Sequence, residues 1–155
     1  MKKVLAIQKK QWKETLKNKE VLIQFLMLPL MAVILTKAIN IPDMQENFFV
    51  IMFASMYTGM APMTSMASII AEEKEKNTLR ILKMSNVTAG QYLVSIGGYV
   101  MLMGLLGSVV FGITGNYTGR NLGLFLVVMA AGILASILVG AVIGISSKSQ
   151  MNASA

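Results

Sequence analysis

Four long apolar stretches constrain the fold of this chain more than any other feature of its sequence. They cover residues 21–39, 48–71, 92–113 and 122–145. The hydrocarbon core of a bilayer is about 30 Å thick, and an α-helix needs roughly 20 apolar residues to cross it. Short, turn-rich connectors separate the first stretch from the second and the third from the fourth, as is typical of neighbouring antiparallel helices. The sequence therefore predicts an all-α membrane protein, with four transmembrane helices in a single domain that takes up residues 1–155.

The composition supports a membrane protein and excludes several kinds of chemistry. Charged residues make up 14% of the chain and hydrophobic residues 55%, whereas soluble domains carry roughly a quarter charged residues. A soluble core could not hide so much apolar surface behind so little polar surface. The chain has no cysteine and no histidine, which removes the commonest metal ligands and the commonest general base. We therefore expect no catalytic residue, no metal and no cofactor.

The basic residues predict the orientation in the membrane. The chain has 14 of them, and in a four-span topology all but Lys37 and Arg120 fall on one side. The positive-inside rule then places both termini and the 72–91 segment in the cytoplasm of a cell-membrane protein. In a soluble protein the net charge of +7 would suggest nucleic acid, but here the charges flank the spans, so no nucleic-acid partner is expected.

Residues 1–19 precede the first span and carry many lysines. On a helix, Met1, Leu5, Trp12 and Leu16 would form one apolar stripe with the lysines outside it. A basic amphipathic helix of this kind lies in the membrane interface, where the ring of Trp12 would act as an anchor. The alternative is a basic flank that only fixes the topology.

Small residues recur every four positions in the last two stretches and predict close helix packing. Such faces let helix backbones approach in a membrane, where hydrophobicity alone cannot drive association. The sequence leaves open whether the partner helix belongs to this chain or to another. The residues are Gly104, Ser108 and Gly112 in the third stretch, and Gly132, Ser136, Gly140 and Gly144 in the fourth.

The second stretch mixes methionines with hydroxyl residues around Pro62 and is a candidate wall of a substrate pathway. Methionine suits surfaces that change shape, and proline marks a kink. The alternative is that the hydroxyls bond to their own helix and the methionines face lipid. No span contains Asp or Glu, which argues against a carrier driven by protons or sodium ions. The candidate pathway residues are Ser55, Thr58, Met63, Ser65 and Ser68.

The predicted cytoplasmic segment begins with acidic residues and continues with basic and apolar ones. On a helix, Glu72 and Lys76 would form an i,i+4 ion pair. The segment is either a solvated connector or a docking element for a soluble partner.

The same segment resembles the cytoplasmic signature of ABC-2-type transporter permeases. Residues 73–79 (Glu-Lys-Glu-Lys-Asn-Thr-Leu) match its Glu-basic-Glu-x-Gly-Thr-Leu pattern, with Asn77 in place of glycine and Arg80 in place of an acidic residue. Residues 85–88 (Ser-Asn-Val-Thr) are similar to the Ser/Thr-Pro-Val-Ser step of the family, with Asn86 in place of proline.

The resemblance implies a permease that pairs with a second copy or homologue and binds a separate ABC ATPase on its cytoplasmic side. This chain has no Gly-x-x-x-x-Gly-Lys-Ser/Thr loop for ATP phosphates. Similar permeases have six spans and this sequence contains four, so the resemblance implies a permease domain that is C-terminally incomplete and truncated after the fourth span. The residues implied to couple to the ATPase are Glu72, Glu73, Lys74, Glu75, Thr78, Leu79 and Leu82.

The leading functional hypothesis is the membrane subunit of an ATP-driven exporter. The uncharged pathway candidates favour a hydrophobic or amphipathic substrate. The alternatives are a membrane anchor or scaffold that recruits a cytoplasmic partner without transporting anything, and a small pore.

Overall fold

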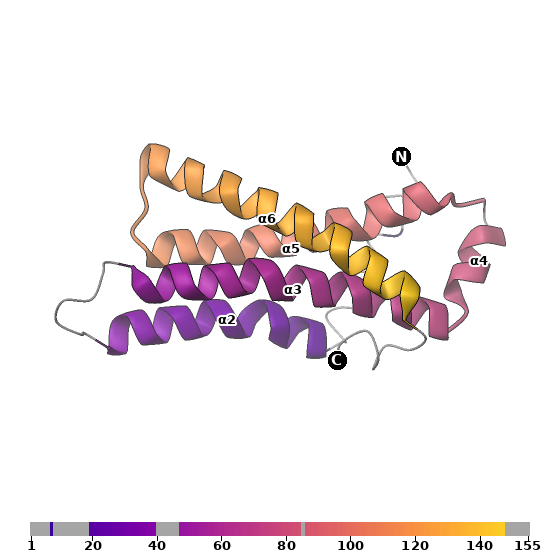
Figure 1. The fold of residues 1–155 in the computed structure, drawn as a ribbon, viewed down its shortest axis with the longest axis horizontal. Coiled ribbons are helices and arrows are strands. Elements are labelled where there is room, and N and C mark those ends of the chain that lie inside the picture. The colour runs from indigo at the N-terminus through magenta and orange to yellow at the C-terminus, as the bar shows by residue number, and fades with distance from the viewer. Residues whose placement is uncertain (1–6, 8–18, 40–46, 85, 148–155) are drawn as a thin grey trace.

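The computed structural model describes residues 7, 19–39, 47–84 and 86–147, and these residues form helices and no strand (Figure 1). The long helices lie side by side along the length of the molecule, and one short helix lies at one end. The predicted all-α fold is confirmed. The predicted in-plane helix over residues 1–19, with its anchor Trp12, lies outside the described residues apart from Ile7 and Lys19. The helices are α2 (Lys19–Ala38), α3 (Phe48–Glu75), α4 (Thr78–Met84), α5 (Ala89–Thr114) and α6 (Gly119–Ser146).

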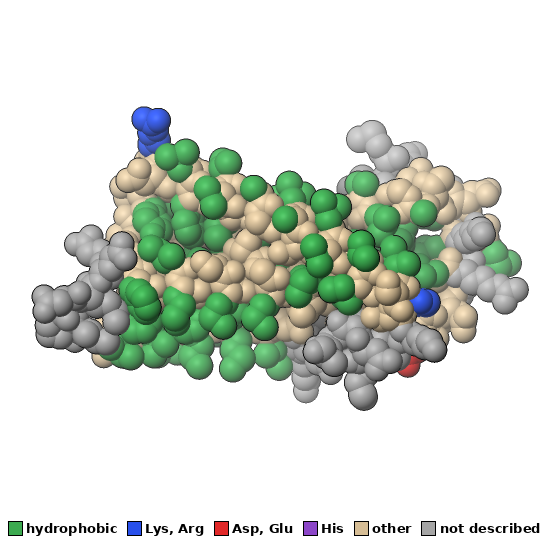
Figure 2. Space-filling view, in the orientation of Figure 1, with side chains coloured by type: hydrophobic (Ala, Val, Ile, Leu, Met, Phe, Trp, Pro, Cys, Tyr) green, Lys and Arg blue, Asp and Glu red, His purple; other side chains and the backbone are tan. Residues whose placement is uncertain are grey.

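Helices α3, α5 and α6 are each long and apolar enough to cross a membrane. The apolar part of α2, Leu22–Ala38, is shorter and lies at the low end of the length that can span a bilayer. Hydrophobic side chains cover much of the visible surface between the two ends of the bundle (Figure 2). Leu106, Val128 and Leu138 are examples of large apolar side chains that are more than half exposed. Lipid can solvate such a surface and water cannot, so the chain is a multi-pass membrane protein.

The helices extend beyond the apolar stretches because local hydrogen bonds continue past the hydrophobic residues. Helix α3 runs to Glu75, through the acidic residues that follow its apolar part. Helix α5 begins at Ala89, behind a capping box. In that box the Gln91 backbone N–H donates to the Thr88 hydroxyl at 3.3 Å, and the Thr88 N–H donates to the Gln91 side chain at 3.4 Å. The box satisfies backbone donors that the start of a helix leaves open.

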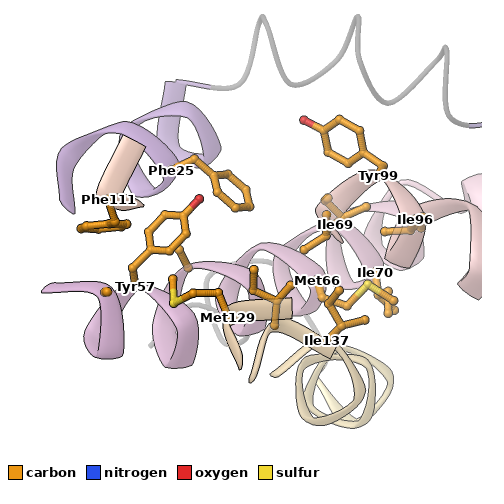
Figure 3. Packing of buried hydrophobic residues seen from close by; sticks show 14 of the residues in the cluster. Phe25, Tyr57, Met66, Ile69, Ile70, Ile96, Tyr99, Phe111, Met129 and Ile137 are labelled. Atoms are coloured by element: carbon orange, nitrogen blue, oxygen red, sulfur yellow. The ribbon is translucent and has the colours of Figure 1, made fainter. Parts of the chain in front are cut away.

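An aromatic cluster ties three helices together at the centre of the bundle. The ring of Tyr57 in α3 lies edge-on to Phe25 of α2 and Phe111 of α5, with ring centroids 6.1 and 5.3 Å apart (Figure 3). The Tyr57 hydroxyl donates to the backbone carbonyls of Met103 and Gly104 in α5, at 3.3 Å each. A Cβ on Gly107 would collide with this hydroxyl. Gly107 is therefore a packing glycine that lies outside the four-residue spacing recognised in the sequence.

The small residues of α6 lie against α3, so the partner helix belongs to the same chain. Helix α6 crosses the bundle diagonally (Figure 1) and makes its most extensive contacts with α3. The Ser136 hydroxyl donates to the Thr58 carbonyl at 2.7 Å. A Cβ on Gly132 would collide with Thr58, and one on Gly140 would collide with the carbonyl oxygen of Met63.

The close approach continues toward the end of α6. A Cβ on Gly144 would lie 2.8 Å from the Ile70 Cβ and 2.9 Å from the Ala67 carbonyl oxygen, which is tighter than atoms in proteins tolerate. Along this half of α6, backbone meets backbone with no room for a side chain.

The small residues of α5 pack in a less uniform way. A Cβ on Gly104 would lie 3.0 Å from Cδ1 of Ile133, and one on Gly112 would lie 2.6 Å from Cδ1 of Leu122, both in α6. Ser108 is buried, but its hydroxyl donates to the Gly104 carbonyl of its own helix at 2.9 Å. The glycines of α5 thus leave room for side chains of α6. In α6, Gly140 leaves room for the backbone of α3, and Gly132 leaves room for the side chain of Thr58.

Candidate functional site

The segment that resembles the permease signature lies at one end of the bundle, where α3 ends, α4 crosses and α5 begins (Figure 1). Helix α4 is seven residues long. Its residues Leu79 and Leu82 are partly buried, and together with Val87 they pack against the hydrophobic core. The Val87 N–H donates to the Leu82 carbonyl at 3.2 Å. Helix α4 is therefore held to the bundle by its apolar side.

Two charged residues among the predicted coupling residues make polar contacts with other helices of the chain. Glu73 is 5% exposed, and its carboxylate interacts with Tyr92 of α5. The Lys74 ammonium donates to the carbonyl oxygens of Ile145 at 2.8 Å and Ser147 at 2.9 Å. These carbonyls belong to the end of α6, where a cation also meets the negative end of the helix dipole. Neither contact is predictable from the sequence, because both depend on which helices are neighbours.

The other predicted coupling residues differ in how much surface they offer. Glu72 is partly buried and forms the expected i,i+4 ion pair with Lys76. Thr78 is partly buried and Glu75 is exposed. Met84, the last residue of α4, is not among the predicted coupling residues and is 80% exposed. A partner reaching this end of the bundle would meet Glu75 and Met84 before it met Glu73.

The departure from glycine at Asn77 has a structural explanation. Asn77 follows the end of α3 with φ at 55°, in the left-handed region. Glycine adopts this region without cost, and asparagine tolerates it better than other residues. Asn86 has φ at 56°, which proline cannot adopt. Asn77 in place of glycine therefore preserves the turn. Asn86 in place of proline requires a turn of a different conformation.

Replacing Asn77 by glycine should leave stability unchanged or raise it slightly, whereas Asn77→Val should lower it by about 1–2 kcal/mol. The reason is that a β-branched residue at positive φ is strained. Thermal unfolding of the purified protein in detergent measures both. Asn121→Val is the control, because Asn121 is exposed in a helix and has no positive φ. Equal losses at both positions would contradict the assignment of strain to the turn.

The candidate pathway residues on α3 do not share one surface. Ser65 and Ser68 are buried, and Met63 faces Gly140. Thr64 and Ser65 donate to the side-chain oxygen of Gln24 in α2, at 3.0 and 3.2 Å. These hydroxyls therefore hold α2 to α3. This is a structural role in helix packing, which is the alternative to lining a pathway.

Ser55 and Thr58 are the two candidates that line a common cavity. This cavity, of about 480 Å³, lies between α3 and α6 and is called here the α3–α6 groove. Both hydroxyls donate to carbonyls of their own helix, Ser55 to Ile51 at 2.8 Å and Thr58 to Ala54 at 2.7 Å. The groove is therefore mainly apolar toward anything that enters it. Its lining includes Ile51, Ser55, Thr58 and Gly59 of α3, and Phe125 and Gly132 of α6.

Comparison with known proteins identifies the family. A family model described as ABC-2 family transporter protein matches residues 6–155. The chain belongs to the ABC-2 transporter family. The resemblance seen in the signature segment is thereby confirmed over almost the whole chain. No curated protein and no solved structure matches the chain.

Membership in this family makes the chain a permease subunit, the membrane-embedded part of an ABC transporter. It also implies association with an ABC ATPase and with the membrane. The ABC-2 permease described here thus combines a four-helix membrane bundle with a short helix, α4, at the end where α3 and α6 finish.

Proposed function

We propose that this ABC-2 permease exports a hydrophobic or amphipathic substrate and is driven by ATP hydrolysis in a separate ATPase subunit. The observation that carries the proposal is the position of α4. Its apolar side packs on the bundle core, while Met84 at the end of α4 and Glu75 at the end of α3 are exposed. If a partner displaces a short helix held in this way, the movement is transmitted to the spans on which the helix packs.

The end of the bundle with α4 is proposed to lie in the cytoplasm of a cell-membrane protein, with both termini on the same side. The distribution of basic residues supports this orientation, because among the Lys and Arg residues of the described helices only Lys37 and Arg120 lie at the opposite end (Figure 1). An ATPase on the cytoplasmic side would then meet α4 directly.

The proposed coupling works through α3 and α6 as one unit. Movement of α4 would be transmitted to the end of α3, which Lys74 links to the end of α6. The close backbone contacts at Gly140 and Gly144 would make the two helices move together. The ATP-bound partner would bind one of two packings of the spans more tightly than the other, and ATP binding would therefore favour that packing.

A second permease copy or a homologue is proposed to complete the pathway. Ser55 and Thr58 line the α3–α6 groove, Met63 and Ser65 make contacts between helices of this chain, and Ser68 is buried. A second subunit would enclose surface that one bundle leaves open. The hydroxyls in the groove are neutral, which supports an apolar or amphipathic substrate over a small ion.

Reconstitution with the ATPase in liposomes tests the proposal. An amphipathic fluorescent dye should cross the membrane only when ATP and an active ATPase are both present. The control is the same ATPase with the lysine of its phosphate-binding loop replaced. Leakage without ATP would favour the pore, and ATPase binding with no dye movement under any condition would favour the anchor or scaffold.

A further inference from the structure

A polar cavity of about 470 Å³ lies at the end of the bundle opposite α4, where α3 begins and α5 joins α6. We call it the polar pocket. The side chains that the structure describes here offer carboxamides and hydroxyls, which can both donate and accept hydrogen bonds, and none of these described side chains is charged. The lining residues are Asn47, Gly115, Asn116, Tyr117, Thr118 and Asn121.

The polar pocket adjoins the α3–α6 groove, because Tyr117 lines both cavities. The Tyr117 ring stacks on Phe125, with centroids 5.0 Å apart and an interplanar angle of 25°. Phe125 is itself part of the groove lining. One continuous surface therefore changes from polar to apolar across a stacked pair of rings. Hydrophobic side chains are visible in the hollow between α6 and the helices beneath it at this end (Figure 2).

The length of the α3–α6 groove is close to the thickness of the hydrocarbon part of one leaflet. Along α3 the groove extends from Ile51 to Gly59, which is about 12 Å at 1.5 Å per residue. Half of a bilayer's hydrocarbon core is about 15 Å thick. The polar pocket lies at the helix ends, at the level of the headgroups, and the groove runs from there toward the middle of the membrane.

We propose that this surface binds a single phospholipid with a zwitterionic headgroup. The headgroup would occupy the polar pocket and one acyl chain would lie in the α3–α6 groove. The described lining of the polar pocket is uncharged, which suits a headgroup without net charge, since an anionic one would need desolvated cations to compensate it. The hydroxyls inside the groove bond to backbone carbonyls, Ser136 to Thr58 among them, so they do not compete with an apolar chain.

This site does not depend on the proposed coupling to an ATPase. Binding can be measured on the permease without a partner and without ATP. A failure of ATP-driven transport would leave the lipid site intact, and a failure of lipid binding would leave the coupling proposal intact.

The test uses phosphatidylcholine with a photoactivatable diazirine in its acyl chain, bound to the purified permease in detergent and mapped by mass spectrometry. Cross-links should concentrate on residues 51–59 and 125–136. Gly59→Leu should reduce them about tenfold or more, because the new side chain fills the groove. Gly123→Leu is the matched control. Neither glycine has any atom within 4 Å of a new Cβ, so both variants should fold.

The headgroup is tested with a second probe, a diazirine fatty acid of the same chain length. Asn121→Ala should reduce labelling by phosphatidylcholine and leave labelling by the fatty acid unchanged. Cross-links spread evenly over the outer faces of α3 and α6, with no effect of Gly59→Leu, would overturn the proposal. Equal labelling of the wild type by both probes would also overturn it, because the polar pocket would then contribute nothing.

Discussion

Replacing Gly140 with leucine should lower the stability of the bundle by roughly 3 kcal/mol, at the upper end of what overpacking costs. A Cβ at this position would collide with the Met63 carbonyl oxygen and lie 3.0 Å from the Met63 Cα. A flexible side chain could move aside, but the backbone of α3 cannot do so without shifting the whole helix. Thermal unfolding of the purified permease in detergent, followed by circular dichroism, measures the loss.

Gly123→Leu is the control for this prediction. Gly123 lies on the same helix, is exposed and has open space at its Cβ position. The substitution should keep or slightly raise stability, because glycine is a poor helix former. Gly144→Leu should behave like Gly140→Leu, since the Ala67 carbonyl oxygen is 2.9 Å from its Cβ position. Equal stability of the variants at 123 and 140 would mean that α6 does not pack on α3 in this way.

The sequence predicts the helices of this fold well because the bilayer sets their length. The stretch at 122–145 corresponds to α6, which runs from Gly119 to Ser146. Helix α3 begins at the predicted residue 48 but passes residue 71 and reaches Glu75. Hydropathy marks the part of a helix that lipid surrounds, whereas the helix itself ends where its backbone hydrogen bonds end.

The packing of the helices is only partly predictable. A four-residue spacing of small residues identifies a contact face from sequence alone, but it does not say which helix lies opposite. The role of Gly107 follows only from the place of Tyr57, which comes from another helix. Contacts between distant parts of the chain belong to the tertiary structure, and the periodicity of residue types in the sequence does not predict them.

In the signature segment, too, local contacts are predictable from the sequence and contacts between helices are not. The ion pair of Glu72 and Lys76 follows from local spacing and is present. The burial of Glu73 beside Tyr92 and the binding of Lys74 to the end of α6 depend on tertiary neighbours. Charge in a sequence suggests an exposed surface, yet a charged side chain at the end of a span can also hold neighbouring helices together.

The strongest expected effect on function is loss of the ATPase on changing two exposed residues of this end of the bundle, Glu75 at the end of α3 and Met84 at the end of α4. Met84→Asp and Glu75→Arg, each made in the permease co-expressed with its ATPase, should reduce co-purification about tenfold or more, or about 1.4 kcal/mol of binding. Both side chains are exposed, so neither change should alter stability by more than about 0.5 kcal/mol. Affinity purification measures the first effect, and thermal unfolding measures the second.

A charge reversal at the other end of the bundle separates docking from a general effect of charge. Arg120 is exposed in the first turn of α6, far along the bundle from α4, and Arg120→Glu should leave the ATPase bound. Glu73→Gln should differ from the variants at Met84, Glu75 and Arg120, because Glu73 is buried beside Tyr92. Its replacement should lower the stability of the permease more than it lowers the affinity for the ATPase. If Met84→Asp and Glu75→Arg retained the ATPase as fully as Arg120→Glu, the partner would have to contact another surface, and α4 would be a connector held against the core by Leu79 and Leu82.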